Sequence, residues 1–166
     1  MHGSAPSRAP DAIRTFFACG ALLAAAGVAC GAFESHGLED FLRDRGLAEE
    51  TIRKRLDQAG TAVRYHLIHS VAVVAIAAAS PWLHPRLLLA SLTAMLGGIL
   101  LFSGSLYVLV LANLPILGAI TPFGGVSLIL AWLLAGWGAF QSPHMNSSPP
   151  SSDAAKQRLP DTEVSL

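Results

Sequence analysis

The stretch that decides the fold is residues 87–140, "LLLASLTAMLGGILLFSGSLYVLVLANLPILGAITPFGGVSLILAWLLAGWGAF". It holds fifty-four consecutive residues without an Asp, Glu, Lys or Arg. A hydrocarbon layer about 30 Å thick is crossed by about 20 helical residues. Asn113 and Pro115 interrupt the stretch, and a proline is a typical helix stop. The sequence therefore predicts two membrane-spanning helices here, at about 87–111 and 121–140.

The composition of the whole chain also indicates a membrane protein. Hydrophobic residues make up 52% of the 166 residues and charged residues only 13%, with a mean hydropathy of +0.51. Soluble domains usually carry about 25% charged residues. The net charge is zero, so the composition gives no sign of a nucleic-acid-binding surface. The length is enough for one domain.

Two further apolar stretches precede the deciding one, at about 14–33 and 65–83. Each is long enough to cross the hydrocarbon layer once. The first could instead be a cleaved signal segment, because "GVAC" at 27–30 resembles a weak lipoprotein cleavage box. However, Gly27 and Gly31 form a GxxxG spacing. That spacing lets another helix approach closely in lipid, and it favours a retained span.

Most of the charged residues lie in the connection between these two spans, residues 34–64. Apolar residues recur there at helical spacing while charges fill the other face. This pattern indicates an amphipathic helix that continues into the second span. Residues 1–12 and 141–166, which are rich in Pro and Ser, are predicted to be disordered. We therefore expect an all-α membrane protein with four transmembrane helices at 13–140 and an amphipathic helical segment between spans one and two.

Four motifs occur in order along the chain: "CGAFESHGLEDF" (30–41), "TAVRYHLIHSVAV" (61–73), "LFSGSLYVLVL" (101–111) and "ITPFGGVSLILAW" (120–132). Together they resemble the small four-helix membrane proteins of domain-of-unknown-function family 423. That family includes YgdD-like bacterial proteins and eukaryotic proteins of the transmembrane-protein-256 type. The resemblance implies a multi-pass protein of the bacterial inner membrane with cytoplasmic termini. It implies no particular activity, cofactor or catalytic residue.

The distribution of basic residues does not agree with that orientation. Six basic residues lie in the connection at 34–64, and basic residues tend to keep a short connection in the cytoplasm. Counting them alone would place the termini outside.

Three histidines are expected near one leaflet, because spans one and two meet it: His36, His66 and His69. With Glu34 they could form a metal site of three or four ligands, although the chain contains no ligand spacing such as HExxH. One alternative is that each imidazole caps a helix or bonds to a backbone carbonyl, and another is that the histidines have a proton-linked role. The first motif also departs from the family pattern, which has small residues where Glu34 and Ser35 stand.

Other polar and small residues in the spans are candidates for helix packing. The polar residues that belong to the motifs are His36, Tyr65, His69, Ser103, Ser105, Tyr107 and Thr121. The glycines expected to pack helices together are Gly27, Gly31, Gly98, Gly104, Gly124 and Gly125. We expect the hydroxyls to bond between helices and Thr121 to cap the fourth span. The alternative is a polar cavity between spans three and four, near the leaflet that does not hold the histidines.

These patterns favour a non-enzymatic integral membrane protein that acts as a scaffold, an assembly partner or a lipid-interacting module. Its partners would be the lipid bilayer and either another membrane protein or a second copy, and not nucleic acid. We find no nucleophile–base–acid arrangement, and spans two to four lack acidic residues. A small oligomeric transporter or channel is one alternative, and a histidine-based metal- or haem-binding module is another.

Overall fold

The structure, a computed structural model, describes residues 9–141, and this part of the chain contains helices and turns but no strand. The α-helices are α1 (Ala9–His36), α2 (Leu38–Asp44), α3 (Glu49–Ala78), α4 (Pro85–Ile99), α5 (Ser105–Ala112) and α6 (Thr121–Phe140). Two 3₁₀ helices, η1 (Ser80–Trp82) and η3 (Pro115–Ala119), and one π-helical turn, η2 (Leu100–Gly104), complete the list.

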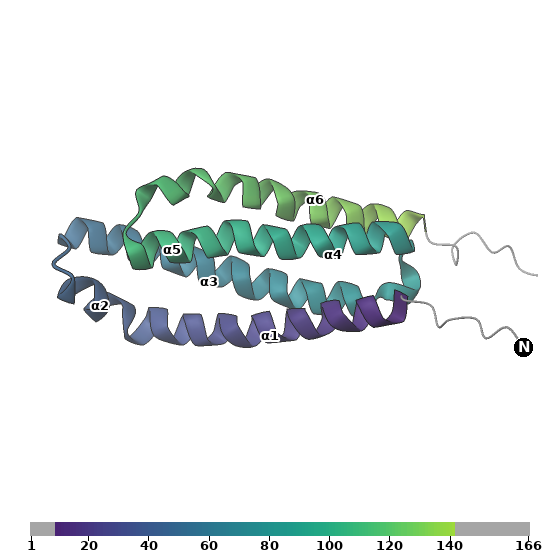
Figure 1. The fold of residues 1–166 in the computed structure, drawn as a ribbon, viewed down its shortest axis with the longest axis horizontal. Coiled ribbons are helices and arrows are strands. Elements are labelled where there is room, and N and C mark those ends of the chain that lie inside the picture. The colour runs from purple at the N-terminus through teal and green to yellow at the C-terminus, as the bar shows by residue number, and fades with distance from the viewer. Residues whose placement is uncertain (1–8, 142–166) are drawn as a thin grey trace, which may run out of the picture.

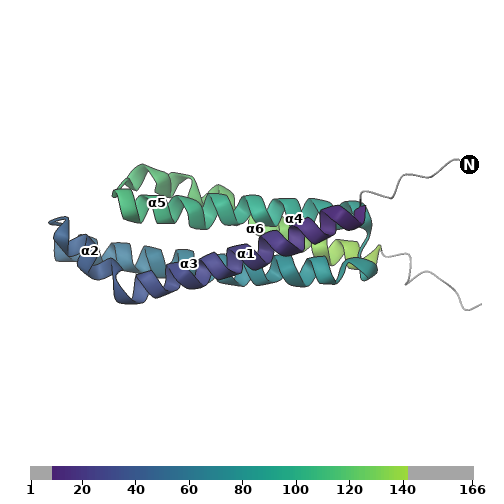
Figure 2. The ribbon, with the colours of Figure 1, turned by 60° about the horizontal axis from the view of Figure 1, so that its bottom comes forward.

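The prediction of four membrane spans is confirmed. The segments that are long and apolar enough to cross a membrane are Asp11–His36, Glu49–Ala78, Pro85–Ala112 and Pro115–Phe140. Antiparallel neighbours pack as two pairs, α1 on α3 and α4 on α6, and α3 packs against α4 in the middle (Figure 1). Helices α1 and α6 are therefore the outer members of the bundle. The described ends of the chain lie at one end of the bundle, and α2 and η3 lie at the other (Figure 2).

The boundaries of the first two spans differ from the predicted ones. Helix α1 begins at Ala9, although residues up to 12 were predicted to be disordered. Pro10 falls in its first turn, where a missing N–H costs no hydrogen bond, and Asp11 is favourable near the helix N-terminus. Residues 1–8 and 142–166, also predicted to be disordered, lie outside the described part.

Helix α3 joins the charged connection to the second span without a break, as predicted. Its first half carries the charges, and its second half crosses the membrane. The helix ends at Ala78 rather than near residue 83, because the chain turns into η1 around Pro81. At the end of the bundle that holds α2, the charged half of α3 lies beside α5, which contains no charged residue.

The third span contains a π-helical turn, η2, that the sequence did not predict. The span continues through it from α4 into α5 and ends at Asn113, which adopts the left-handed conformation with φ of 52°. Asparagine accepts this conformation more readily than most side chains. The predicted break at Asn113 and Pro115 is thus present, and its backbone geometry explains the sharp stop.

Glycines set how closely the helices approach at several crossings. A Cβ added at Gly27 would lie 2.7 Å from Leu67 Cδ2 of α3, and one at Gly31 would lie 3.2 Å from Val63. A Cβ added at Gly124 would overlap the backbone nitrogen of Phe102. The small-residue faces of α1 and α6 therefore pack within the molecule, where contact between helices replaces contact with lipid.

The remaining predicted packing glycines differ in how closely a neighbouring helix approaches them. A Cβ added at Gly98 would lie 2.7 Å from Leu128 Cγ, which fits a close crossing of α4 and α6. Gly125 has only an ordinary contact, 3.7 Å from the ring of Phe102. Gly104 does not pack as predicted, because an added Cβ would meet no atom within 4 Å. Gly104 instead closes the π-helical turn.

Candidate functional site

Polar side chains gather in the bundle interior around the π-helical turn. His66 of α3 is only 6% exposed, and its Nδ1 lies 3.1 Å from the hydroxyl of Tyr107 on α5. The other ring nitrogen, Nε2, is buried and has no hydrogen-bond partner within residues 9–141. A polar pair in an apolar interior is costly unless the two groups bond to each other. The pair therefore fixes α3 and α5 at one depth.

This contact contradicts one alternative drawn from the sequence. A polar cavity between spans three and four was expected near the leaflet that does not hold the histidines. His66 and Tyr107 are in contact, so Tyr107 of span three lies at the same depth as a histidine of span two.

A second group of rings lies beside this pair. Tyr65 stacks on the ring of His69 with centroids 5.5 Å apart and on the ring of Phe102 with centroids 4.4 Å apart. Nδ1 of His69 lies 2.8 Å from the backbone oxygen of Tyr65. A carbonyl can only accept, so Nδ1 of His69 carries the proton and donates. His69 therefore bonds to a carbonyl of its own helix, which agrees with the alternative that the histidines bond to backbone carbonyls.

Three hydroxyls bridge helices or stabilise the π-helical turn. Ser103 donates to the backbone oxygen of Ala62 on α3 at 2.9 Å, and Ser105 donates to the backbone oxygen of Phe102 at 3.0 Å. The hydroxyls of Ser105 and Thr121 are 3.0 Å apart. The prediction that Thr121 caps α6 is wrong, because the helix has no side-chain cap and Thr121 is already helical. Its hydroxyl joins α6 to α5 instead.

Arg55 is a buried residue that the sequence interpretation did not single out. It is 5% exposed, and its Nε and Nη2 donate to Oδ1 of Asn113 at 3.0 and 2.6 Å. Its Nη1 donates to Oε1 of Gln58 at 2.8 Å. A signal was available, because Arg55 lies three residues after Ile52 and four before Ala59, on the apolar face of its helix.

A second arginine contacts the same end of α5. Arg45, directly after α2, donates from Nη1 to the backbone oxygen of Leu111. Its guanidinium also lies 5.4 Å from the ring centroid of Phe41. Carbonyls in the last turn of a helix have no partner within the helix. The two arginines therefore attach the α2–α3 region to the C-terminal turn of α5.

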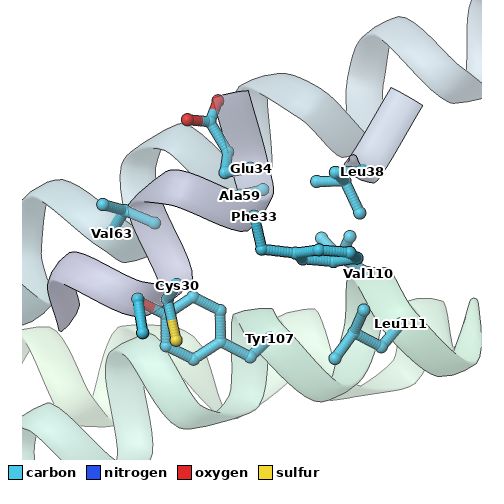
Figure 3. Close-up of a pocket in the computed structure, with 10 residues that line it drawn as sticks. Cys30, Phe33, Glu34, Leu38, Ala59, Val63, Tyr107, Val110 and Leu111 are labelled. Carbon is cyan, nitrogen blue, oxygen red and sulfur yellow. The ribbon is translucent and has the colours of Figure 1, made fainter. Parts of the chain in front are cut away.

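A lateral groove lies between α1, α2 and α5, with α3 as its floor (Figure 3). Its volume is about 350 Å³. The lining residues are Ala29, Cys30, Phe33, Glu34, Leu38, Ala59, Val63, Tyr107, Val110 and Leu111. The carboxylate of Glu34 is directed away from the groove in Figure 3, and a Cβ added at Gly60 of α3 would lie 3.5 Å from its Oε1. The surface of the groove is therefore almost entirely apolar.

The groove follows from how α1 packs. Its glycines bring it against α3, and α1 and α5 are not among the closely packed helix pairs. The space between α1 and α5 stays partly open, with the ring of Tyr107 and the sulfur of Cys30 close together in it (Figure 3). We take the groove, together with the His66–Tyr107 pair behind it, as the candidate functional site.

The candidate metal ligands do not come together. Within residues 9–141 no group of three or more His, Cys, Asp or Glu is placed to hold a metal ion. His66 bonds to Tyr107, and His69 bonds to a backbone carbonyl. His36 and Glu34 lie at the α1–α2 turn, in a separate polar hollow. The structure therefore gives no geometric support to the metal-site alternative.

Comparison with known proteins defines the family. The family model described as "Protein of unknown function (DUF423)" matches residues 30–125, which is more than half of the chain. The chain belongs to the DUF423 family. No solved structure matches it.

The named relatives of this chain are membrane proteins. The UPF0382 membrane protein YwdK of Bacillus subtilis is 37% identical over 74% of this chain and 93% of its own length. UPF0382 membrane proteins of Haemophilus influenzae and Staphylococcus epidermidis are 36% and 38% identical, over 69% and 74% of this chain and 85% and 92% of their own lengths. These names state a membrane location and no enzymatic activity. The protein is therefore an integral membrane protein of a family whose molecular function is not defined.

Proposed function

We propose that this DUF423 protein is a non-enzymatic, lipid-interacting module of the bacterial inner membrane, and that it holds one acyl chain of a membrane lipid in the lateral groove. The single observation that carries the proposal is the groove itself, with its volume of about 350 Å³ and its apolar lining. Sites for small ligands usually measure about 300–1,000 Å³. A groove at the lower end of that range suits one hydrocarbon chain better than a whole lipid.

The driving force for this binding is packing rather than removal of apolar surface from water. Lipid tails are as apolar as leucine, so a chain gains little from the hydrophobic effect when it leaves the bulk bilayer. An unfilled hollow, however, loses dispersion contacts along its whole lining. A chain that fills the groove regains those contacts. The shape of the groove then selects between chains, since a kinked or branched chain fills it differently.

The walls of the groove are held in place before any ligand arrives. Helix α5 is attached to α3 by the His66–Tyr107 contact and by the Arg55–Asn113 hydrogen bonds, and the adjoining turn is attached by the Ser103–Ala62 bond. Pre-organised walls lower the cost of ordering that accompanies binding. This supports a permanent binding site rather than a transient gap between helices.

The location of the groove suggests which leaflet supplies the lipid. The groove lies toward the end of the bundle that holds α2, and the described chain ends lie at the opposite end (Figures 1 and 2). With cytoplasmic termini, as the family resemblance implies, the groove opens to the periplasmic leaflet. This orientation is part of the proposal.

The test is native mass spectrometry of the protein released from a mild detergent, with Leu111→Trp as the variant. Leu111 lines the groove and is 41% exposed, so a larger ring can enter the groove without displacing buried side chains. Leu130→Trp is the matched control, since Leu130 is 50% exposed on α6 and does not line the groove. We expect the wild type and the control to retain one lipid and Leu111→Trp to lose it.

The outcomes separate the proposal from its alternatives. Equal lipid retention in all three proteins would show that lipid binds elsewhere and would overturn the groove. A bare monomer in all three would refute lipid binding. A lipid-free dimer would favour the scaffold alternative. Neither transport nor metal binding has a specific observation in its favour within residues 9–141.

A further inference from the structure

We infer that the lipid held in the groove carries a phosphate, and that Arg45 binds this phosphate at the mouth of the groove. This inference rests on the proposed function and adds to it the chemical class of the ligand. It depends on the position of Arg45, on its free donors and on the placement of the carboxylates around it.

Arg45 is positioned at the mouth by contacts on two sides. Its Nη1 donates to the backbone oxygen of Leu111, a residue that lines the groove. Its guanidinium lies over the ring of Phe41 on α2. Gly46 follows with φ of 71°, a conformation that glycine adopts without strain and side chains adopt rarely. The turn after α2 therefore sets Arg45 beside the last turn of α5.

The guanidinium keeps unused hydrogen-bond donors. Within residues 9–141 its only hydrogen-bond acceptor is the Leu111 oxygen, and the ion pairs of this region join Arg43 to Glu39 and to Glu49. Arg45 is exposed, so its Nε and Nη2 groups remain available. Guanidinium groups bind phosphate oxygens with two parallel hydrogen bonds, which makes arginine well suited to phosphate recognition.

The direction of the groove along α5 fits a phospholipid. An acyl chain between Tyr107 and Leu111 runs along α5 toward its C-terminal turn, and the Arg45 contact lies at that turn. The headgroup of a chain held there therefore lies next to Arg45. The one carboxylate whose residue lines the groove, that of Glu34, points away from it (Figure 3). Arg45 thus supplies a cation beside the headgroup position, and neither ion pair found within residues 9–141 involves it.

A purely structural role for Arg45, as a cap for the Leu111 carbonyl, makes a different prediction. A cap would contribute to stability and would not depend on the chemistry of the lipid. A phosphate-binding role makes lipid affinity depend on both the arginine and the phosphate. The discriminating measurement is therefore affinity for two lipids that differ only in the phosphate headgroup.

The experiment titrates the full-length protein in mild detergent with phosphatidylglycerol and with diacylglycerol of the same acyl chains, and counts bound lipid by native mass spectrometry. We expect the wild type to bind phosphatidylglycerol about tenfold more tightly, which corresponds to about 1.4 kcal/mol. Arg45→Gln should lose most of that preference and retain diacylglycerol binding. Arg53→Gln is the control, because it removes the same charge from an exposed position on α3.

Each outcome supports or overturns one proposal. Equal affinity of the wild type for the two lipids, or an unchanged preference in Arg45→Gln, would overturn the phosphate inference while leaving the groove in place. An equal loss in Arg53→Gln would indicate general electrostatic attraction and would also overturn it. Absence of binding for both lipids would instead refute the proposed function. If Arg45→Gln fails to fold, Arg45→Lys takes its place, because lysine keeps the charge and lacks the two parallel donors. Arg45→Lys should weaken the preference for phosphatidylglycerol, and an unchanged preference would overturn the inference. Phosphatidylethanolamine, as a third ligand, separates recognition of phosphate from recognition of net negative charge.

Discussion

Replacement of Arg55 by Met should destabilise the protein, because Arg55 is the buried cation that attaches α3 to the end of the third span. The substitution keeps an apolar stem of similar length and removes three hydrogen bonds to Asn113 and Gln58. Hydrogen bonds to a charged group contribute about 1.5–3 kcal/mol each. Two of the three share one acceptor atom, and burial of the guanidinium itself costs several kcal/mol. We therefore expect a loss of about 2–4 kcal/mol in the free energy of unfolding.

The assay is reversible unfolding in mixed micelles, where added sodium dodecyl sulfate unfolds the helices and circular dichroism follows the loss. Arg53→Met is the control on the same helix, since Arg53 is exposed and should change stability by less than about 0.5 kcal/mol. A double-mutant cycle with Asn113→Gly isolates the contact. Glycine keeps the left-handed backbone of Asn113, so the variant mainly removes the acceptor. Additive losses in the cycle, or a loss in Arg55→Met no larger than the control, would refute the reasoning.

Three further predictions test other parts of the structure. Gly124→Ala should lower the free energy of unfolding by about 3 kcal/mol or more, because an added Cβ would overlap the Phe102 backbone. Gly125→Ala should be nearly neutral or stabilising in the same assay. Equal effects of the two substitutions would contradict the close crossing of α6 and the π-helical turn. Tyr107→Phe removes the hydroxyl that contacts a buried histidine and should lower the free energy of unfolding by about 1 kcal/mol. Tyr65→Phe keeps its ring stacking and should change stability little. A larger loss in Tyr65→Phe than in Tyr107→Phe would argue against the buried His66–Tyr107 pair. If the termini are cytoplasmic, a C-terminal green fluorescent protein fusion should be fluorescent and a C-terminal alkaline phosphatase fusion should be inactive. The opposite pattern would place the groove in the cytoplasmic leaflet instead of the periplasmic leaflet.

The four spans could be predicted because hydropathy over about twenty residues is a summed signal that single exceptions do not change. The sharp end of the third span was also predictable, since an Asn and a Pro two residues apart mark a helix stop. The exact start of α1 could not be predicted. Its first turn falls in a stretch rich in Pro and Ala that composition alone assigns to disorder.

The π-helical turn and the groove depend on tertiary contacts that periodicity does not encode. One extra residue in a helical turn leaves the local hydropathy unchanged, so η2 carries no sequence signal of its own. The groove arises because α1 packs on α3 more closely than on α5. The spacing of residues along α1 does not specify the distance between α1 and α5. The burial of Arg55 could have been predicted from the sequence, because a charged residue on the apolar face of a helix needs a buried hydrogen-bond partner.

The unequal lengths of the first and third spans have a consequence for the surrounding membrane. The apolar run of α1, Phe16–Phe33, rises about 27 Å, whereas the uncharged segment from Leu87 to Ala112 rises about 39 Å. A bilayer of uniform thickness cannot match both heights at once. Helix tilt absorbs part of the difference, and the bilayer absorbs the rest by thickening beside α5 and thinning beside α1, at a cost of a fraction of a kcal/mol for each ångström of mismatch. The protein should therefore impose a local gradient of bilayer thickness around its perimeter, and its stability should be greatest in membranes whose lipids vary enough in chain length to follow that gradient.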